Sequence, residues 1–186
     1  MFIIFTHDTD YYLIRIYELL PCHSERSEES PTFETMNEII WQCKPFKELS
    51  NEELYQIFRL RISIFVVEQN CPYQDADGKD LKSLHVTGKQ NGELVAYTRI
   101  VLPGVSYKEV SIGRVVTSKE VRRTGSGKML IKKSMDYIQK EFGNVPIRIG
   151  AQLYLQEFYE SFGFVRQGDE YLEDGIPHII MLFVPR

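Results

Sequence analysis

The residue pattern with the clearest chemistry is a basic, glycine-containing loop at residues 122–128, with the sequence RRTGSGK. Gly125 and Gly127 allow a tight backbone whose N–H groups converge, and a helix starting there adds unsatisfied donors and its positive dipole end. Residues 119–133 carry six basic side chains and one acidic side chain, although the whole chain has a net charge of −4. This arrangement favours a seat for a phosphate or pyrophosphate. The alternative interpretation is a solvated helix face behind an ordinary glycine turn.

Two common nucleotide-binding motifs are excluded by individual residues of this loop. A Walker loop needs a glycine five positions before Gly127, where this chain has Arg122. It also needs a serine or threonine after the lysine, where this chain has Met129. The dinucleotide fingerprint needs a third glycine at the position that Leu130 occupies. The loop therefore fits neither motif.

Hydrophobic spacing indicates which elements hold the loop in place. Residues 111–117 are β-branched and apolar enough for a strand in the centre of a sheet. Behind the loop, one helix face is expected to pack on that sheet, because apolar residues recur at helical spacing: Ile131, Met135, Ile138 and Phe142. The loop is therefore expected between a central strand and a long helix.

The rest of the chain predicts a mixed sheet with helices around it. Ser50 and Glu53 form a capping box at the start of a helix that ends before Pro72. A short helix at 153–162 is closed by Gly163. Strands are expected at residues 39–44, 84–89, 93–102, 109–117, 145–151, 164–167 and 179–184. Strands before and after central helices predict an α+β domain, or equivalently an α/β three-layer domain.

Two sequence blocks, in this order, resemble the GNAT superfamily of acyl-CoA-dependent N-acetyltransferases. The first is the Arg-x-x-Gly-x-Gly pattern at 122–127, and the second is FYESFGF at 158–164. Within the superfamily, the chain is most similar to the bacterial ElaA-type family, over residues 61–80, 112–117 and 150–178. The resemblance spans about residues 38–184.

This resemblance implies a GNAT-like mixed, largely antiparallel sheet of six to seven strands, with helices on both faces. The sheet is expected to split between the strands at 112–117 and 147–151, where the pantetheine arm of CoA adds as a strand. Backbone N–H groups near Val115 and Val116 are expected to polarise the acyl carbonyl. The implied acyl-CoA contacts are Val115, Val116, Thr117, Arg122, Arg123, Thr124, Gly125, Ser126, Gly127 and Lys128.

The implied reaction transfers an acetyl group from acetyl-CoA, as cosubstrate, to an amine of a small molecule or protein by direct attack in a ternary complex. Tyr159 matches the tyrosine of the family's short fourth helix, and the resemblance implies that it protonates the departing thiolate. A tyrosine hydroxyl with its ordinary pKa of ~10 is in the donor form at neutral pH. From the residues alone, a core tyrosine between Phe158 and Phe162 is the competing interpretation.

The sequence leaves open which group takes the proton from the amine. Glu68, His85 and His178 lie in stretches that resemble the ElaA-type pattern, and we retain Glu68 and His178 as the catalytic candidates. Arg61 and Gln69 are candidates for orienting a carboxylate or amide of the substrate. For each of these residues the alternative is a structural hydrogen bond or a solvated position. A water chain can also deprotonate an amine.

Two other functions share parts of this pattern. A non-catalytic acyl-CoA-binding module has the same loop without turnover. An acyl-homoserine-lactone-synthase-like enzyme is motivated by Arg61-x-x-x-Phe65, but it implies an acyl carrier protein as donor, and the intact CoA loop argues against that. Attraction of a cationic amine is one role for the acidic loop residues Asp75, Asp77, Asp80, Glu173 and Asp174.

Length and composition bound the remaining options. The 186 residues predict one domain at 36–186, and residues 1–35 are expected to be a disordered or spurious extension upstream of Met36. Three cysteines without Cys-x-x-Cys spacing indicate no disulfide framework and no metal site, and favour a cytoplasmic location. A pI of 5.6 argues against nucleic acid as a partner, and no apolar run reaches the ~18 residues of a membrane span. A homodimer is among the assemblies that the sequence allows.

Overall fold

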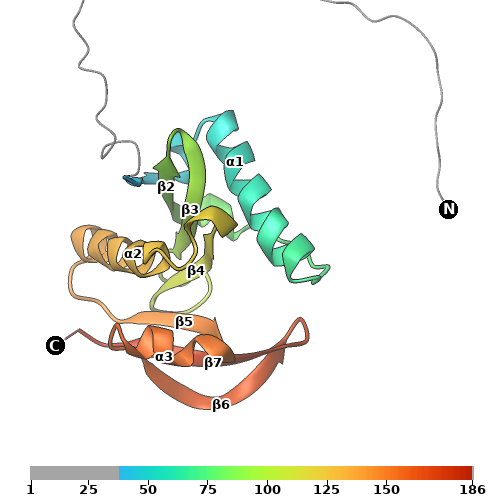
Figure 1. The fold of residues 1–186 in the computed structure, drawn as a ribbon. Coiled ribbons are helices and arrows are strands. Elements are labelled where there is room, and N and C mark those ends of the chain that lie inside the picture. The colour runs from blue at the N-terminus through green and yellow to red at the C-terminus, as the bar shows by residue number, and fades with distance from the viewer. Residues whose placement is uncertain (1–37, 186) are drawn as a thin grey trace, which may run out of the picture. The chain divides into compact units, whose positions relative to one another are not determined.

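The computed structural model describes residues 38–185, and the expectations for residues 1–35 and for a start at Met36 lie outside them. A seven-stranded sheet with the order β1-β2-β3-β4-β5-β7-β6 forms the centre of this part of the chain (Figure 1). Its strands are β1 (Ile40–Pro45), β2 (Ser83–Gln90), β3 (Glu93–Val101), β4 (Val110–Thr117), β5 (Ile147–Gln152), β6 (Val165–Glu173) and β7 (Ile176–Phe183). The predicted mixed, largely antiparallel sheet is confirmed.

The sheet is split between β4 and β5, as the family resemblance implies. Every other pair of neighbouring strands is antiparallel, whereas β4 and β5 run parallel. They pair only through Val110 with Ile147 and Ser111 with Arg148. Beyond Ser111 the strands diverge, and Figure 1 shows β5, β7 and β6 as a separate wing below β4. Backbone groups of β4 on the β5 side are therefore left without a neighbouring strand.

Helices cover both faces of the sheet. Helix α1 (Asn51–Arg61) begins with the predicted capping box, in which Ser50 and Glu53 each accept from the other's backbone N–H. It packs with Tyr97 and Val116 in one hydrophobic cluster. Helix α2 (Ser126–Phe142) and helix α3 (Gln156–Glu160) pack in the other cluster, which contains Leu130, Ile131, Ile138 and Tyr159. The predicted three-layer arrangement is confirmed.

The helix predicted from Ser50 to Pro72 differs from the observed structure in its second half. It is α-helical only as far as Arg61, and residues Ile62–Glu68 form a π-helical segment. The N–H of Gln69 donates to the carbonyl of Ile64, five residues earlier, which is the π-type pattern. The wider turn changes the direction of the side chains that follow, and Phe65, Glu68 and Gln69 line the cleft described below.

Strand β6 is longer than the predicted segment at 164–167. It continues to Glu173 although most of its side chains are exposed. β6 is the edge strand next to β7, so its residues beyond Gln167 need not alternate between apolar and polar side chains. A prediction from hydrophobic alternation therefore ends the strand before its true end at Glu173. The register shifts between Gln167 and Tyr171, so the β6–β7 hairpin bends along its length.

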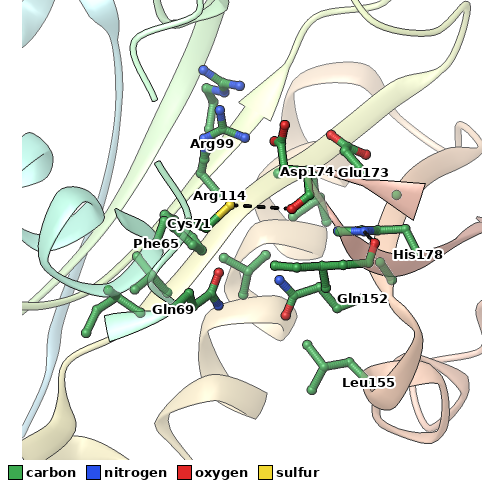
Figure 2. A pocket seen from close by; sticks show the side chains of 18 of the residues that line it. Phe65, Gln69, Cys71, Arg99, Arg114, Gln152, Leu155, Glu173, Asp174 and His178 are labelled. Atoms are coloured by element: carbon green, nitrogen blue, oxygen red, sulfur yellow. Dashed lines mark hydrogen bonds between the residues drawn. The ribbon is translucent and has the colours of Figure 1, made fainter. Parts of the chain in front are cut away.

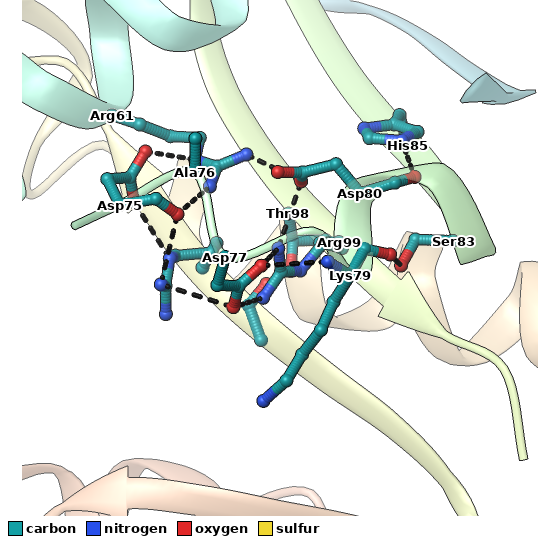
Figure 3. Close-up of polar contacts among 12 residues, drawn as sticks. Arg61, Asp75, Ala76, Asp77, Lys79, Asp80, Ser83, His85, Thr98 and Arg99 are labelled. Atoms are coloured by element: carbon teal, nitrogen blue, oxygen red, sulfur yellow. Dashed lines mark hydrogen bonds and ion pairs between the residues drawn. The ribbon is translucent and has the colours of Figure 1, made fainter. Parts of the chain in front are cut away.

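A buried ionic network holds the loop before β2 against β3, β4 and the end of α1 (Figure 3). It consists of three arginines and three aspartates: Arg61, Arg99, Arg114, Asp75, Asp77 and Asp80. The network is electrically balanced, which is the condition under which charges are tolerated in a protein interior.

Arg61 is the most deeply buried member of this network, with no exposed surface. Its Nε lies 2.9 Å from Oδ2 of Asp75, and its Nη1 donates to Oδ1 of Asp80 at 2.7 Å. Burial alone raises the pKa of Asp80, but the hydrogen bond and charge of Arg61 and the charge of Arg99 lower it below its usual range. The loop is therefore fixed by ion pairs that water does not screen.

Candidate active site

A cleft of about 760 Å³ runs along the split between β4 and β5. In Figure 2, Phe65, Gln69, Cys71 and Arg114 lie on one side of it, and Gln152, Glu173, Asp174 and His178 lie on the other. The Sγ of Cys71 lies 3.7 Å from the carbonyl oxygen of Asp174, which connects the two sides. The cleft is thus bounded by the π-helical segment and by the turn between β6 and β7.

Strand β4 forms the floor of the cleft and contains a bulge. Arg114 has a φ of 55°, and the register against β3 shifts at this point, so that Arg114 and Val115 lie opposite Thr98. The side chain of Arg114 turns to Asp75, with 2.8 Å between Nε and Oδ1. The candidate acyl-CoA contacts on this strand are Val115, Val116 and Thr117, and all three line the cleft.

The loop from Arg122 to Lys128 has the compact backbone that an anion seat needs. Arg123 and Gly125 adopt left-handed conformations, with φ of 65° and 89°. The first helical hydrogen bond of α2 runs from the N–H of Met129 to the carbonyl of Gly125. Preceding N–H groups of the helix therefore have no intrahelical acceptor. The hydroxyls of Thr124 and Ser126 lie 2.7 Å apart and cross-link the turn.

Seven of the predicted acyl-CoA contacts lie at residues 122–128. Among these, all of which the structure describes, only Arg122 lines the cleft. Its guanidinium makes two hydrogen bonds to the carboxylate of Glu68, at 2.7 and 3.1 Å. Lys119 lies 3.5 Å from the same carboxylate. The hydrogen bond from Arg122 lowers the pKa of Glu68. Glu68 is therefore a weaker base than an unpaired glutamate.

Tyr159 lines the cleft from the side of α3. Only 5% of its surface is exposed, and its hydroxyl makes no hydrogen bond to any described residue. Its ring makes edge contacts with Phe158 and Phe164, as the core-tyrosine interpretation expects, and a role for the hydroxyl as proton donor stays a prediction. Burial raises the pKa of Tyr159, which keeps the hydroxyl protonated.

His178 lies on β7 opposite Gln152 of β5 and lines the cleft. Its Nδ1 is 2.8 Å from the carbonyl oxygen of Ile176. A carbonyl oxygen only accepts, so Nδ1 carries the hydrogen in this contact, and Nε2 of a neutral ring has a free lone pair. The centroid of its ring lies 5.8 Å from that of Tyr171, and the two rings are tilted by 32° to each other.

The structure assigns two of the other sequence candidates to the interior instead of the cleft. His85 is buried, with Nδ1 2.8 Å from the hydroxyl of Tyr97 and Nε2 3.0 Å from the carbonyl of Asp80. Burial lowers its pKa. Arg61 belongs to the ionic network, has no exposed surface and does not line the cleft, so its guanidinium cannot reach a substrate carboxylate there. The third, Gln69, does line the cleft.

The acidic loop residues separate into two groups. Asp75, Asp77 and Asp80 are each paired with arginine, so the expectation that they attract a cationic amine is wrong. Glu173 and Asp174 lie at the β6–β7 turn and line the cleft, and no salt bridge joins them to any basic side chain in residues 38–185. Only these two remain candidates for recognising a positive charge.

Arg114 and Tyr107 are cleft residues that the sequence interpretation missed. A signal for Arg114 was present, because a lone charged residue interrupts the otherwise apolar strand around it. No comparable signal marks Tyr107, which lies in the loop between β3 and β4. Among the described residues, no group of histidine, cysteine and acidic side chains is arranged to hold a metal ion. No helix in the same range is long and apolar enough to span a membrane.

Comparisons with known proteins agree with this geometry. The family model described as "Acetyltransferase (GNAT) domain" matches residues 62–184. The protein ElaA of Escherichia coli K12 is 46% identical over 145 residues, which cover 77% of this chain and 95% of ElaA.

Solved structures give the same result. The crystal structure of an acyl-CoA N-acyltransferase from Pseudomonas aeruginosa aligns with a TM-score of 0.76 at 39% identity, over 78% of this chain and 99% of that one. The structure of E. coli ElaA aligns with a TM-score of 0.74 at 44% identity, with the same coverage. A CoA-dependent acyl-homoserine lactone synthase, BjaI, aligns with a TM-score of 0.65 at 15% identity, over 81% of this chain and 84% of that one, and this likeness concerns the fold alone.

Proposed function

The chain belongs to the GNAT acetyltransferase family and is a relative of ElaA, and from that premise we propose that it transfers an acetyl group from acetyl-CoA to an amine. The family supports acyl-CoA-dependent N-acyl transfer in general, and acetyl as the group transferred is our proposal. The observation that carries it is the cleft at the β4–β5 split, which reaches both Arg122 of the basic loop and Tyr159. One extended ligand fits that geometry.

We assign the binding of acetyl-CoA to the two elements on either side of the split. The diphosphate is held by backbone N–H groups at the start of α2 and by the basic side chains of the loop at 122–128. The pantetheine amides pair with the free side of β4 near Val115, Val116 and Thr117. In this proposed binding mode the thioester lies near Tyr159, which lines the same cleft as Val115, Val116 and Thr117.

In the proposed reaction, the lone pair of a neutral acceptor amine attacks the thioester carbonyl carbon. A C–N bond forms, the C–S bond breaks, and the electron pair of that bond leaves on the CoA sulfur. Tyr159 donates its proton to this sulfur, and the proton that the amine loses restores the tyrosine through a base or water. The products are an amide and the free thiol of CoA, and direct attack in a ternary complex needs no acyl-enzyme.

Binding to the loop is tested by calorimetry with acetyl-CoA at moderate salt. Reversing both charges in the double variant Arg122→Glu, Arg123→Glu is expected to weaken binding by about 100-fold, because two charge-assisted contacts to phosphate are lost. Lys140→Glu, at the other end of α2, is the matched control and is expected to change affinity by less than about twofold, because the effect falls off within one turn of the helix terminus. Equal affinity in the double variant and the wild type would place the diphosphate elsewhere.

We propose His178 as the base, with its Nε2 facing the acceptor, and Glu68 as the weaker candidate because its carboxylate is paired with Arg122. His178→Gln is expected to lower kcat by about 100-fold, the usual contribution of a positioned base. Glu68→Gln is expected to change kcat by less than about threefold and to alter the KM for acetyl-CoA, since it frees Arg122. The opposite pattern in steady-state thiol release would make Glu68 the base.

A non-catalytic acyl-CoA-binding module is the second candidate, because the same loop and split serve binding alone. Thiol release from acetyl-CoA, screened against polyamines, amino acids, aminoglycosides and peptides, separates the two functions. Saturable release with at least one amine supports the enzyme. Acetyl-CoA binding in calorimetry without release from any of these amines favours the module.

A further inference from the structure

The β5 side of the cleft contains a strand position that has no side chain. A Cβ atom at Gly150 would lie 2.9 Å from the hydroxyl of Tyr171 and 3.5 Å from the hydroxyl of Tyr107. Two phenol oxygens from separate segments therefore converge over the backbone of this glycine. Glycine within a strand is typical of places where another group approaches the backbone closely.

Glu173 adds a negative charge to this pair of hydroxyls. The hydroxyl of Tyr171 donates to Oε2 of Glu173 at 3.2 Å. Burial, and after it the charge of Glu173, raises the pKa of Tyr107 and of Tyr171. Two other cleft carboxylates are neutralised by arginine, namely Glu68 and Asp77, whereas Glu173 has no ion-pair partner among residues 38–185. An uncompensated negative charge therefore lies at this end of the cleft.

Ser111 gives independent evidence that this end of the cleft takes a ligand. It is 5% exposed and lines the cleft at the point where β4 and β5 separate. Its hydroxyl makes no hydrogen bond to any residue that the structure describes, and the same holds for the hydroxyl of Tyr107. A hydroxyl that lines a cleft without a protein partner, on a side chain as nearly buried as that of Ser111, is available to a polar group of a ligand.

Taking the proposed N-acyltransfer as given, we propose that Tyr107, Ser111, Tyr171 and Glu173 form an acceptor subsite for a second, protonated amino group of the substrate. An ammonium group donates three hydrogen bonds and carries one positive charge. The subsite offers hydroxyl oxygens and one carboxylate, which complement both properties. The substrate class is therefore the diamines, in which one nitrogen is acetylated as the neutral amine and the other remains an ammonium ion.

The experiment compares four acceptors of similar length, with acetyl-CoA as donor and thiol release as the signal. 1,4-Diaminobutane and 1,5-diaminopentane carry the second ammonium, butylamine lacks it, and 4-aminobutanoate replaces it with a carboxylate. The kcat/KM for the diamines is expected to exceed that for butylamine by about tenfold or more, with 4-aminobutanoate the poorest, because a charge-assisted contact is gained or reversed.

The variant Glu173→Gln removes the charge and keeps the shape of the side chain. It is expected to lower kcat/KM for 1,4-diaminobutane by about tenfold and to leave that for butylamine within about twofold. Glu170→Gln, an exposed carboxylate on the same strand and outside the cleft, is the control and is expected to change neither value. Equal loss for both amines, or no loss for the diamine, would overturn the subsite.

Failure of the proposed function gives a different result. If no amine releases thiol, calorimetric titration of 1,4-diaminobutane into the protein saturated with CoA measures the subsite alone. Binding that Glu173→Gln weakens by at least about fivefold, and Glu170→Gln does not, supports the subsite without the reaction. Absence of diamine binding in that titration overturns the subsite, and turnover of butylamine with no preference for diamines overturns it while the N-acyltransferase function stands.

Discussion

Arg61→Met is expected to lower the free energy of unfolding by about 3–5 kcal/mol, because breaking a buried ion pair leaves an uncompensated charge in the interior. The guanidinium has no exposed surface and contacts Asp75 and Asp80, both of which are about 95% buried. Methionine fills a similar volume but offers no hydrogen bonds. Urea denaturation followed by circular dichroism measures the loss.

The matched control lies two residues earlier on the same helix. Arg59 is exposed and pairs with Glu93 at 2.9 Å, so Arg59→Met is expected to cost less than about 1 kcal/mol. Both substitutions remove one arginine from α1, but Arg61 loses two buried ion pairs whereas Arg59 loses one exposed pair, so the comparison measures what the buried pairs contribute. Losses of equal size in the two variants would contradict a structural role for the network.

Tyr159→Phe is expected to lower kcat by about 100-fold or more and to leave acetyl-CoA affinity unchanged, because the variant removes a proton donor and keeps the packing of the ring. The hydroxyl is the only part of the side chain that lacks a partner among the described residues, and the ring keeps its contacts with Phe158 and Phe164. Steady-state thiol release gives kcat, and calorimetry gives the affinity.

Tyr137→Phe provides the control for loss of a phenol hydroxyl. Tyr137 lies on α2, partly buried against the same hydrophobic cluster, and it does not line the cleft. Its substitution is expected to change kcat by less than about twofold. Unchanged turnover in Tyr159→Phe, with normal binding, would remove Tyr159 from the mechanism and leave water as the proton source.

The features predicted correctly from the sequence are those set by local patterns. The capping box at Ser50 depends on two residues three positions apart, and α2 depends on apolar residues at helical spacing. The position of the sheet split followed from the family resemblance, and the pairing of β4 with β5 through two residues each confirms it. The capping box and α2 need no knowledge of the tertiary contacts, whereas the split between distant strands could be expected only from the resemblance.

The features that were missed depend on contacts between distant residues. Arg61 lies 14 positions before Asp75 and 19 before Asp80, so nothing local distinguishes it from the solvated Arg59. No local signal marks Asp75 and Asp80 as buried either. Their charge suggested recognition of a cationic substrate, whereas in the structure they neutralise arginines in the interior. Arg123 has a left-handed backbone conformation that sequence reasoning assigns to glycine, and the tight turn around it determines that conformation.

The ion pair between Glu68 and Arg122 has a consequence for selectivity among polyanions. Glu68 acts as an internal counter-ion and neutralises the loop arginine that faces it. In the proposed binding mode a diphosphate displaces this carboxylate, so a ligand that brings charge alone is expected to gain little from the exchange. We therefore expect nucleic acid and free phosphate to compete poorly with a ligand that also fills the gap between β4 and β5.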